Sequence, residues 1–151
     1  MKNIFEMDVT QEVIDRINCL TSDSKRLWGK MAVGQMLAHV NIQYEVIYES
    51  DKFPKPNFFV RFMLKIFVKS KVVGSNPFAK NGKTAPYFVI KDDKDFDKEK
   101  SRLIAYITKT QENGVAVLLP RDTKSFGKLT AEEWSNMFYK HLDHHLAQFG
   151  V

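Results

Sequence analysis

The sequence predicts an all-α fold, a bundle of four principal helices joined by long irregular connections. Apolar residues recur at intervals of three and four in four separate segments, which is the period of an amphipathic helix. No segment shows the sustained alternation of apolar and polar residues that is typical of a half-buried strand. The chain has 151 residues and no internal repeats, so one domain spanning residues 1–151 is expected.

The first helix is predicted over residues 9–20. Its apolar stripe consists of Val9, Val13, Ile14 and Ile17. Asp8 and Gln11 have the spacing of a capping box at its start. Cys19, the only cysteine, continues the apolar spacing, and we expect it to be a buried packing residue and not a nucleophile.

The second helix is predicted over residues 32–48. Its apolar residues at helical spacing are Met36, Leu37, Val40, Tyr44 and Ile47. His39 and Gln43 lie in the middle of this segment. A turn-rich stretch, FPKPNF, follows the helix and contains two prolines.

Residues 58–73, FFVRFMLKIFVKSKVV, are apolar on nearly every side of a helix except at Arg61, Lys65 and Lys69. This segment is either a buried helix with a solvated basic edge, or an exposed contact surface for another subunit or a membrane. Because the basic edge is narrow, packing or dimerisation is favoured over membrane contact.

Residues 73–94 show no sustained helical pattern, and such a long connection is often functional or mobile. A third bundle helix is predicted over residues 96–112, before Gly114. The VAVLLP stretch that follows is expected to be a short extended piece. The last helix is predicted over residues 131–149, and Thr130 with Glu133 forms its capping box.

Composition excludes several classes of protein. The chain is 44% hydrophobic and has 12 Phe, too apolar for a disordered protein. A single cysteine rules out an internal disulfide framework and fits a reducing compartment. The first residues do not resemble a signal peptide, and no apolar run approaches the roughly 18–20 residues of a membrane span. A cytoplasmic location and no membrane partner are therefore expected.

The basic balance of the chain is mild, with a net charge of +5 and a pI of about 9.2. Lysines and aromatic residues between Phe53 and Lys71 suggest a nucleic-acid binder as one possibility. The sequence contains no motif known to read nucleic acid, and the lysines are scattered. A solvated surface explains them more simply, and no nucleic-acid partner is expected.

Three of the four histidines lie within five residues near the end of the last helix. His141 and His145 are four residues apart and project from one face, so both rings can reach one metal ion at roughly 2.0–2.1 Å. His144 points about 100° away from His145. His39 is the only other histidine and could supply the third ligand. The alternatives are a satisfied core histidine at position 39 and a solvated terminal helix.

Four stretches carry a family resemblance. They are LWGKMAVGQMLAHV (27–40), KNGKTAP (80–86), FGKLTAEEW (126–134) and KHLDHHLAQFGV (140–151). Together they resemble the DinB-like superfamily of DinB/YfiT-type metalloenzymes, in a branch known only as a domain of unknown function. The resemblance implies a four-helix bundle, often dimeric, with a divalent metal at one end of a cleft. It assigns the metal to His39, His141 and His145, with His144 as the adjacent residue that is not a ligand.

The resemblance also implies a function, because characterised relatives include a mycothiol-dependent isomerase and bacillithiol S-transferases. We therefore expect a divalent-metal-dependent enzyme that acts on a small molecule, by thiol transfer or hydrolysis. Zinc or nickel is the expected metal, a low-molecular-weight thiol is a possible cofactor, and a homodimer is the expected assembly.

The sequence does not identify a catalytic residue. Glu45 and Asp143 are candidates for a general base by proximity alone. The alternative hypothesis is therefore a non-catalytic dimeric module that binds a metal or another ligand. Gln35, Gln43 and Gln148 are candidates to hydrogen-bond the metal ligands or to face a substrate, although a helix-end cap is the favoured role of Gln148.

Overall fold

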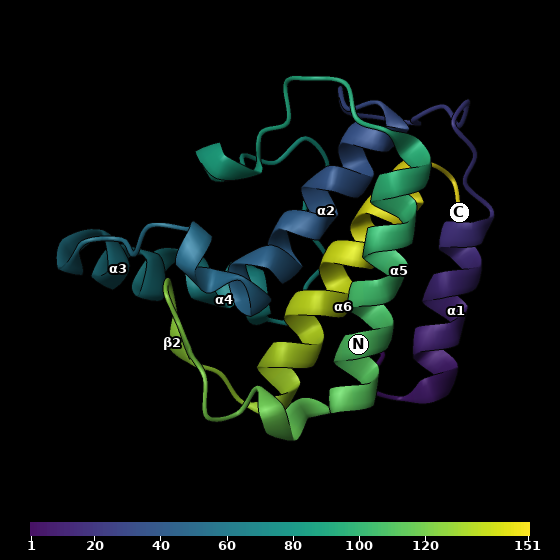
Figure 1. Cartoon of the computed structure of the whole chain (residues 1–151). Helices are drawn as coiled ribbons and strands as arrows, with labels where there is room; N and C mark the ends of the chain where they lie inside the picture. Colours follow the sequence, from purple (N-terminus) through teal and green to yellow (C-terminus); the bar gives the residue numbers. More distant parts are fainter.

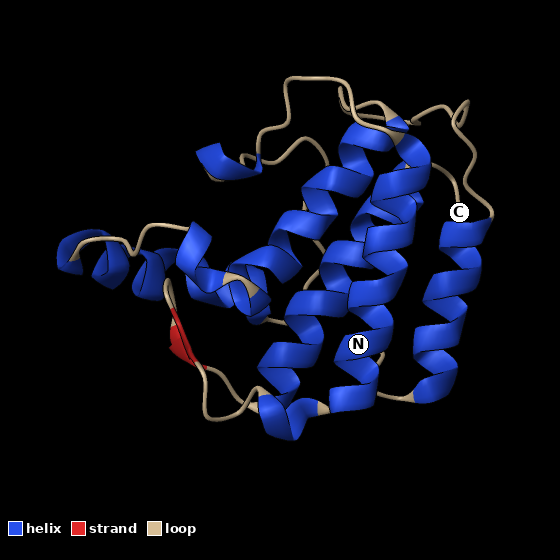
Figure 2. Cartoon of the chain, viewed as in Figure 1, coloured by secondary structure: helices blue, strands red, loops and turns tan.

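The computed structural model describes residues 1–151 and is mostly helical (Figure 2). Four long helices lie alongside one another (Figure 1): α1 (Met7–Asn18), α2 (Val33–Tyr48), α5 (Phe96–Asn113) and α6 (Ala131–Gln148). Helices α1 and α2 each contact both α5 and α6. The all-α prediction is confirmed, and the long predicted helices match to within about two residues at each end.

The core is formed by the apolar faces of these four helices. Trp134, Tyr44 and Phe138 are its largest fully buried side chains. The rings of Tyr44 and Phe138 stack with their centroids 4.9 Å apart, and the Trp134 ring lies 6.0 Å from Phe138 on the same stack. Full burial of such a side chain stabilises the fold by about 1.5–3 kcal/mol. Helix α6 therefore has little freedom to shift relative to α2.

A side-chain cap sets the start of α6, whereas the cap predicted for α1 does not form. Thr130 Oγ1 accepts the amide hydrogen of Glu133 at 3.2 Å, and Glu133 Oε2 accepts that of Thr130 at 2.9 Å, so the predicted capping box of α6 is confirmed. The predicted box at Asp8 and Gln11 is wrong. Helix α1 starts two residues earlier than predicted, at Met7, and Glu6 at its N-cap makes no side-chain cap.

Two other local predictions were also wrong. Cys19 is exposed, because it follows the last residue of α1 and leaves the helical stripe. The VAVLLP stretch contains a 3₁₀ turn, η4 (Val115–Val117), where an extended piece was expected. After it come two short antiparallel strands, β1 (Asp122–Thr123) and β2 (Gly127–Lys128), in which Asp122 pairs with Lys128.

The segment between α2 and α5 projects from the four long helices (Figure 1). It contains α3 (Phe58–Met63), a π-helical turn η2 (Leu64–Val68) and α4 (Lys69–Val73), which follow one another without a break. We call these residues the 58–73 arm. The interpretation as a buried helix is wrong, because Val73 is the only buried residue of the arm.

Three single-turn helical pieces complete the connections around the arm and after it. They are η1 (Ser50–Lys52), η3 (Pro86–Phe88) and the η4 turn described above. Between the arm and α5 the chain is otherwise irregular, as the sequence predicted for residues 73–94. None of the helices is both long and apolar enough to cross a membrane.

Candidate metal centre

Three of the four histidines come together between α2 and α6. His39 lies in the middle of α2, and His141 and His145 lie one turn apart on α6. One ring nitrogen from each residue falls within 4.8 Å of the others. The Nε2 atoms of His39 and His141 are 3.0 Å apart. The three histidines predicted as metal ligands are thus neighbours in the fold, and His144 is outside the group.

The ring of His39 is held by the connection between the arm and α5. Its Nδ1 lies 2.9 Å from the backbone oxygen of Phe88. A carbonyl oxygen can only accept, so Nδ1 carries the hydrogen and donates it. The lone pair of neutral His39 is therefore on Nε2, which faces His141.

Gln43, one turn after His39, holds the ring of His141. Its Nε2 donates to the backbone oxygen of Met137 at 2.9 Å, which fixes the orientation of the amide. Its Oε1 then lies 2.5 Å from His141 Nδ1 and accepts the hydrogen of that nitrogen. The lone pair of His141 is left on Nε2, as in His39.

Gln148 holds the ring of His145 in the same way. Its Nε2 donates to the backbone oxygen of Trp28 at 2.8 Å, and its Oε1 accepts from His145 Nδ1 at 2.9 Å. The loop can approach this closely because residue 29 is glycine, with φ +83°. A Cβ there would lie 2.2 Å from Gln148 Nε2. Gln148 therefore orients a histidine, and its side chain does not serve as the favoured helix-end cap.

The three imidazoles have the same electronic arrangement. Each Nδ1–H donates to a fixed oxygen, so each Nε2 presents a lone pair. Two lone pairs 3.0 Å apart do not form a hydrogen bond, and a shared cation relieves their repulsion. A histidine with one nitrogen on a metal and the other hydrogen-bonded to an oxygen is the usual arrangement at metal sites. The donor set therefore fits a divalent ion that prefers imidazole.

Burial keeps these rings neutral. It lowers the pKa of His39, although the bond to Phe88 opposes the shift. Burial, followed by the charges of His145 and His39, lowers the pKa of His141 well below its ordinary value. Burial also lowers the pKa of His145 to about 3. Neutral imidazole is the form that binds a metal, so the site needs no deprotonation near pH 7.

Aromatic rings pack around the histidines. Phe88 lies 5.2 Å from the ring of His39, and Phe78 meets the ring of His141 edge-on at 6.4 Å. His144 lies between Trp28, at 4.6 Å, and Phe78, at 5.6 Å. The sequence reasoning missed these three aromatic residues. A signal was present in the sequence, because Trp28 lies within the LWGKMAVGQMLAHV stretch, and Phe78 and Phe88 lie on either side of the KNGKTAP motif.

The other candidate residues form no hydrogen bond to the three clustered histidines. Gln35 accepts the amide hydrogen of Ala32 at 2.9 Å at the start of α2, and it makes no hydrogen bond to a histidine. Glu45 is paired with Arg102, and Asp143 is paired with Arg16 at 2.8 Å. Neither carboxylate is therefore free to act as a general base at the histidine cluster.

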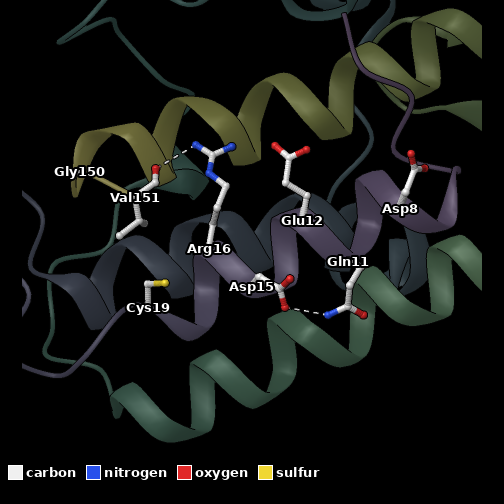
Figure 3. A pocket seen from close by; sticks show the side chains of 8 residues that line it. All are labelled: Asp8, Gln11, Glu12, Asp15, Arg16, Cys19, Gly150 and Val151. Carbon is white, nitrogen blue, oxygen red and sulfur yellow. Dashed lines mark hydrogen bonds between the residues drawn. The ribbon is translucent and has the colours of Figure 1, made fainter.

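An open groove of about 700 Å³ lies in a different part of the molecule (Figure 3). It lies beside α1 and the last two residues, and none of its lining residues is a histidine. Arg16 crosses it and donates to the backbone oxygen of Val151 at 2.9 Å. This contact, together with the Arg16–Asp143 pair, fastens the end of the chain to α1. The contacts of Arg16 in the groove therefore serve to hold the end of the chain in place.

Comparison with known proteins gives one match. The family model described as "Protein of unknown function (DUF1569)" matches residues 2–150, which include all the histidines and the residues that hold them. No curated protein matches the chain, and no solved structure matches it.

Proposed function

The chain belongs to the DUF1569 family, and we propose that it is a divalent-metal-dependent enzyme whose ion is held by His39, His141 and His145. One observation carries the proposal: every ring has its Nδ1–H engaged by an oxygen, and one ring nitrogen of each histidine lies within 4.8 Å of the others. A satisfied core histidine would use both nitrogens for hydrogen bonds. In a solvated terminal helix, the ring nitrogens would be hydrogen-bonded to water.

The geometry suits a small tetrahedral ion. Bonds of about 2.0–2.1 Å place two ligand nitrogens of such an ion roughly 3.3 Å apart. The His39–His141 pair, at 3.0 Å, is already close to that spacing. Zinc or nickel is the preferred ion, because imidazole suits both and the site has no thiolate. Three protein ligands leave a position open, where the ion would lower the pKa of a bound water or thiol.

We assign the chain to the DinB-like superfamily and its four-helix bundle type. Two of the stretches that carry the resemblance meet at this site. Trp28 and Gly29 belong to the first, Gln148 belongs to the last, and the Trp28 carbonyl holds Gln148 against His145. The proposed reaction is thiol transfer to a small molecule, or its hydrolysis. Gln43 and Gln148 orient the rings, while Phe78 and Phe88 limit the access of water.

Metal analysis tests the site. Protein purified without a histidine tag should contain close to one divalent ion per chain, measured by mass spectrometry of the elements. His39→Ala and His141→Ala should lose it. The matched control is His144→Ala, which removes a neighbouring imidazole and should keep the ion. A metal-free wild-type chain, or equal loading in all three variants, would contradict the proposal.

A non-catalytic dimeric module that binds a metal or ligand is the second candidate. The ion pairs of Glu45 and Asp143 favour it, because they leave the site without a free carboxylate base. Turnover of electrophiles and esters, with and without a panel of low-molecular-weight thiols, separates the two. A rate above that of the metal-stripped protein supports the enzyme. A metal-loaded protein with no such rate supports the module.

A further inference from the structure

The 58–73 arm has the reverse of the usual distribution of polarity. Its phenylalanines face outward, and Phe58 and Phe59 are 86% and 69% exposed. The other exposed large apolar residues of the arm are Val60, Phe62, Met63, Ile66 and Phe67. By contrast, the charged side chains of Arg61 and Lys69 are only 26% and 22% exposed. A contiguous apolar surface of this kind usually marks an interaction site.

The π-helical turn helps to make this surface continuous. In an α-helix, residues four apart drift by about 40° around the axis, so a row at i, i+4 and i+8 winds away from one face. A π turn has more residues per turn and cancels part of this drift. The turn at Leu64–Val68 begins after Phe62 and contains Ile66; both residues are exposed, as is Phe58.

The arm is fastened to the rest of the protein by its charged edge. Arg61 Nη2 lies 2.7 Å from Asp122 Oδ1, and Lys69 Nζ lies 2.7 Å from Glu133 Oε1. At the end of the arm, Lys140 donates to the backbone oxygen of Gly74 at 2.5 Å and to that of Lys71 at 2.8 Å. With these charges engaged on the inner side, the apolar face is held toward the outside.

Positive charge is concentrated in the segment of the sequence that contains the arm. Nine of the 23 Lys and Arg residues, but none of the 18 Asp and Glu residues, lie between Lys52 and Lys91. Outside this segment the acidic residues outnumber the basic ones, so the segment accounts for the net charge of +5. Six of the nine form no ion pair within the chain: Lys55, Lys65, Lys71, Lys80, Lys83 and Lys91.

We propose that the 58–73 arm docks on an anionic lipid surface. Its phenyl rings enter the boundary between headgroups and acyl chains, and the exposed, unpaired Lys65 and Lys71 of the arm contact lipid phosphates. An apolar face that carries unpaired lysines and contains no Asp or Glu of its own is complementary to such a surface. A second copy of the chain fits less well, because a two-fold interface would bring the same cationic segment against itself. The prediction from the sequence counted only Arg61, Lys65 and Lys69 and left out Lys71 of the same arm, so it underestimated this charge.

Vesicle sedimentation tests the proposal. The full chain should sediment with vesicles of phosphatidylcholine mixed with phosphatidylglycerol, and at least tenfold less with phosphatidylcholine alone. Added salt should weaken the binding, because it screens the lysines. A double variant, Phe58→Ser with Phe62→Ser, should lose at least tenfold in affinity. Lys65→Gln with Lys71→Gln should lose severalfold.

Matched controls come from other surfaces. Met7→Ser with Leu119→Ser removes two exposed apolar residues elsewhere, and Lys25→Gln with Lys98→Gln removes two exposed charges elsewhere; both should bind vesicles like the wild type. Circular dichroism confirms that each variant is folded.

Two results would overturn the proposal. One is sedimentation that does not differ between the two vesicle types or between the wild type and the Phe58/Phe62 variant. The other is a wild-type dimer in light scattering, dissociated by the Phe58/Phe62 variant and without vesicle binding, which would make a second copy the occupant of the arm. Metal loading is independent of either result.

Discussion

The histidine cluster and the 58–73 arm each depart from the usual rule of polar outside and apolar inside, in opposite directions. In the cluster, polar rings are buried, and each is compensated by a hydrogen bond from Nδ1 to an oxygen. In the arm, apolar rings are exposed, and ion pairs on the opposite edge hold them there. In both regions a set of fixed polar contacts maintains an arrangement that hydrophobic burial alone would not produce.

The largest expected effect is the loss of stability when a core phenylalanine is truncated, compared with the same truncation in the arm. Phe138→Ala should lower the free energy of unfolding by about 3–5 kcal/mol, because Phe138 is fully buried in the aromatic stack. Phe58→Ala should change it by no more than about 0.5 kcal/mol. Urea unfolding measures both. A large loss in Phe58→Ala would show that the arm packs against the chain in solution.

Removing the buried lysine at the base of the arm should have the next largest effect. Lys140 is 2% exposed, and its ammonium group satisfies two backbone oxygens. Lys140→Met should cost about 1.5–3 kcal/mol, as expected for hydrogen bonds from a charged donor. It should also speed amide exchange in residues 69–78. Lys128→Met, at an exposed site, is the control; equal exchange in the two variants would show that Lys140 does not fasten the arm.

Replacing Gln43 provides the corresponding test of the histidine cluster. Gln43→Leu removes the acceptor of His141 Nδ1 and should weaken metal affinity tenfold to a hundredfold, or about 1.4–2.7 kcal/mol. Titration calorimetry on metal-stripped protein measures this. Gln35→Leu changes a glutamine on the same helix that contacts no histidine, and it should bind metal like the wild type. Equal affinities in the two variants would mean that Gln43 does not orient the ligand.

The smallest expected effect is at the start of α6, outside both regions, and it gives a reference for the effects predicted within them. Thr130→Ala removes the cap of α6 and should lower the free energy of unfolding by about 1 kcal/mol. Ser101→Ala, on the exposed side of α5, should be nearly neutral. Urea unfolding again provides the measurement. If Thr130→Ala also abolished metal binding, the start of α6 would control the position of His141 and His145, and the cluster would be less independent than it appears in the structure.

Much of the fold could be predicted because helical periodicity is a local property. The four long helices and the Thr130 cap depend on residues within a few positions of one another. The error at Cys19 arose because α1 ends one residue before it. The error in the arm arose because apolar spacing shows that a helix has an apolar side and does not show what covers that side. For the same reason, the arm could not be identified as exposed from the sequence.

The sequence by itself determined that His141 and His145 share a helix face, and it left His39 as the only remaining histidine. Only the tertiary structure decided how these rings are held. The acceptor of His39 is the backbone of Phe88, 49 residues away, and Gln148 is oriented by the backbone of Trp28, 120 residues away. A backbone carbonyl has no signature in the sequence, and its position depends on how the whole chain packs. The nitrogen that each ring presents to the proposed ion was therefore set by the fold.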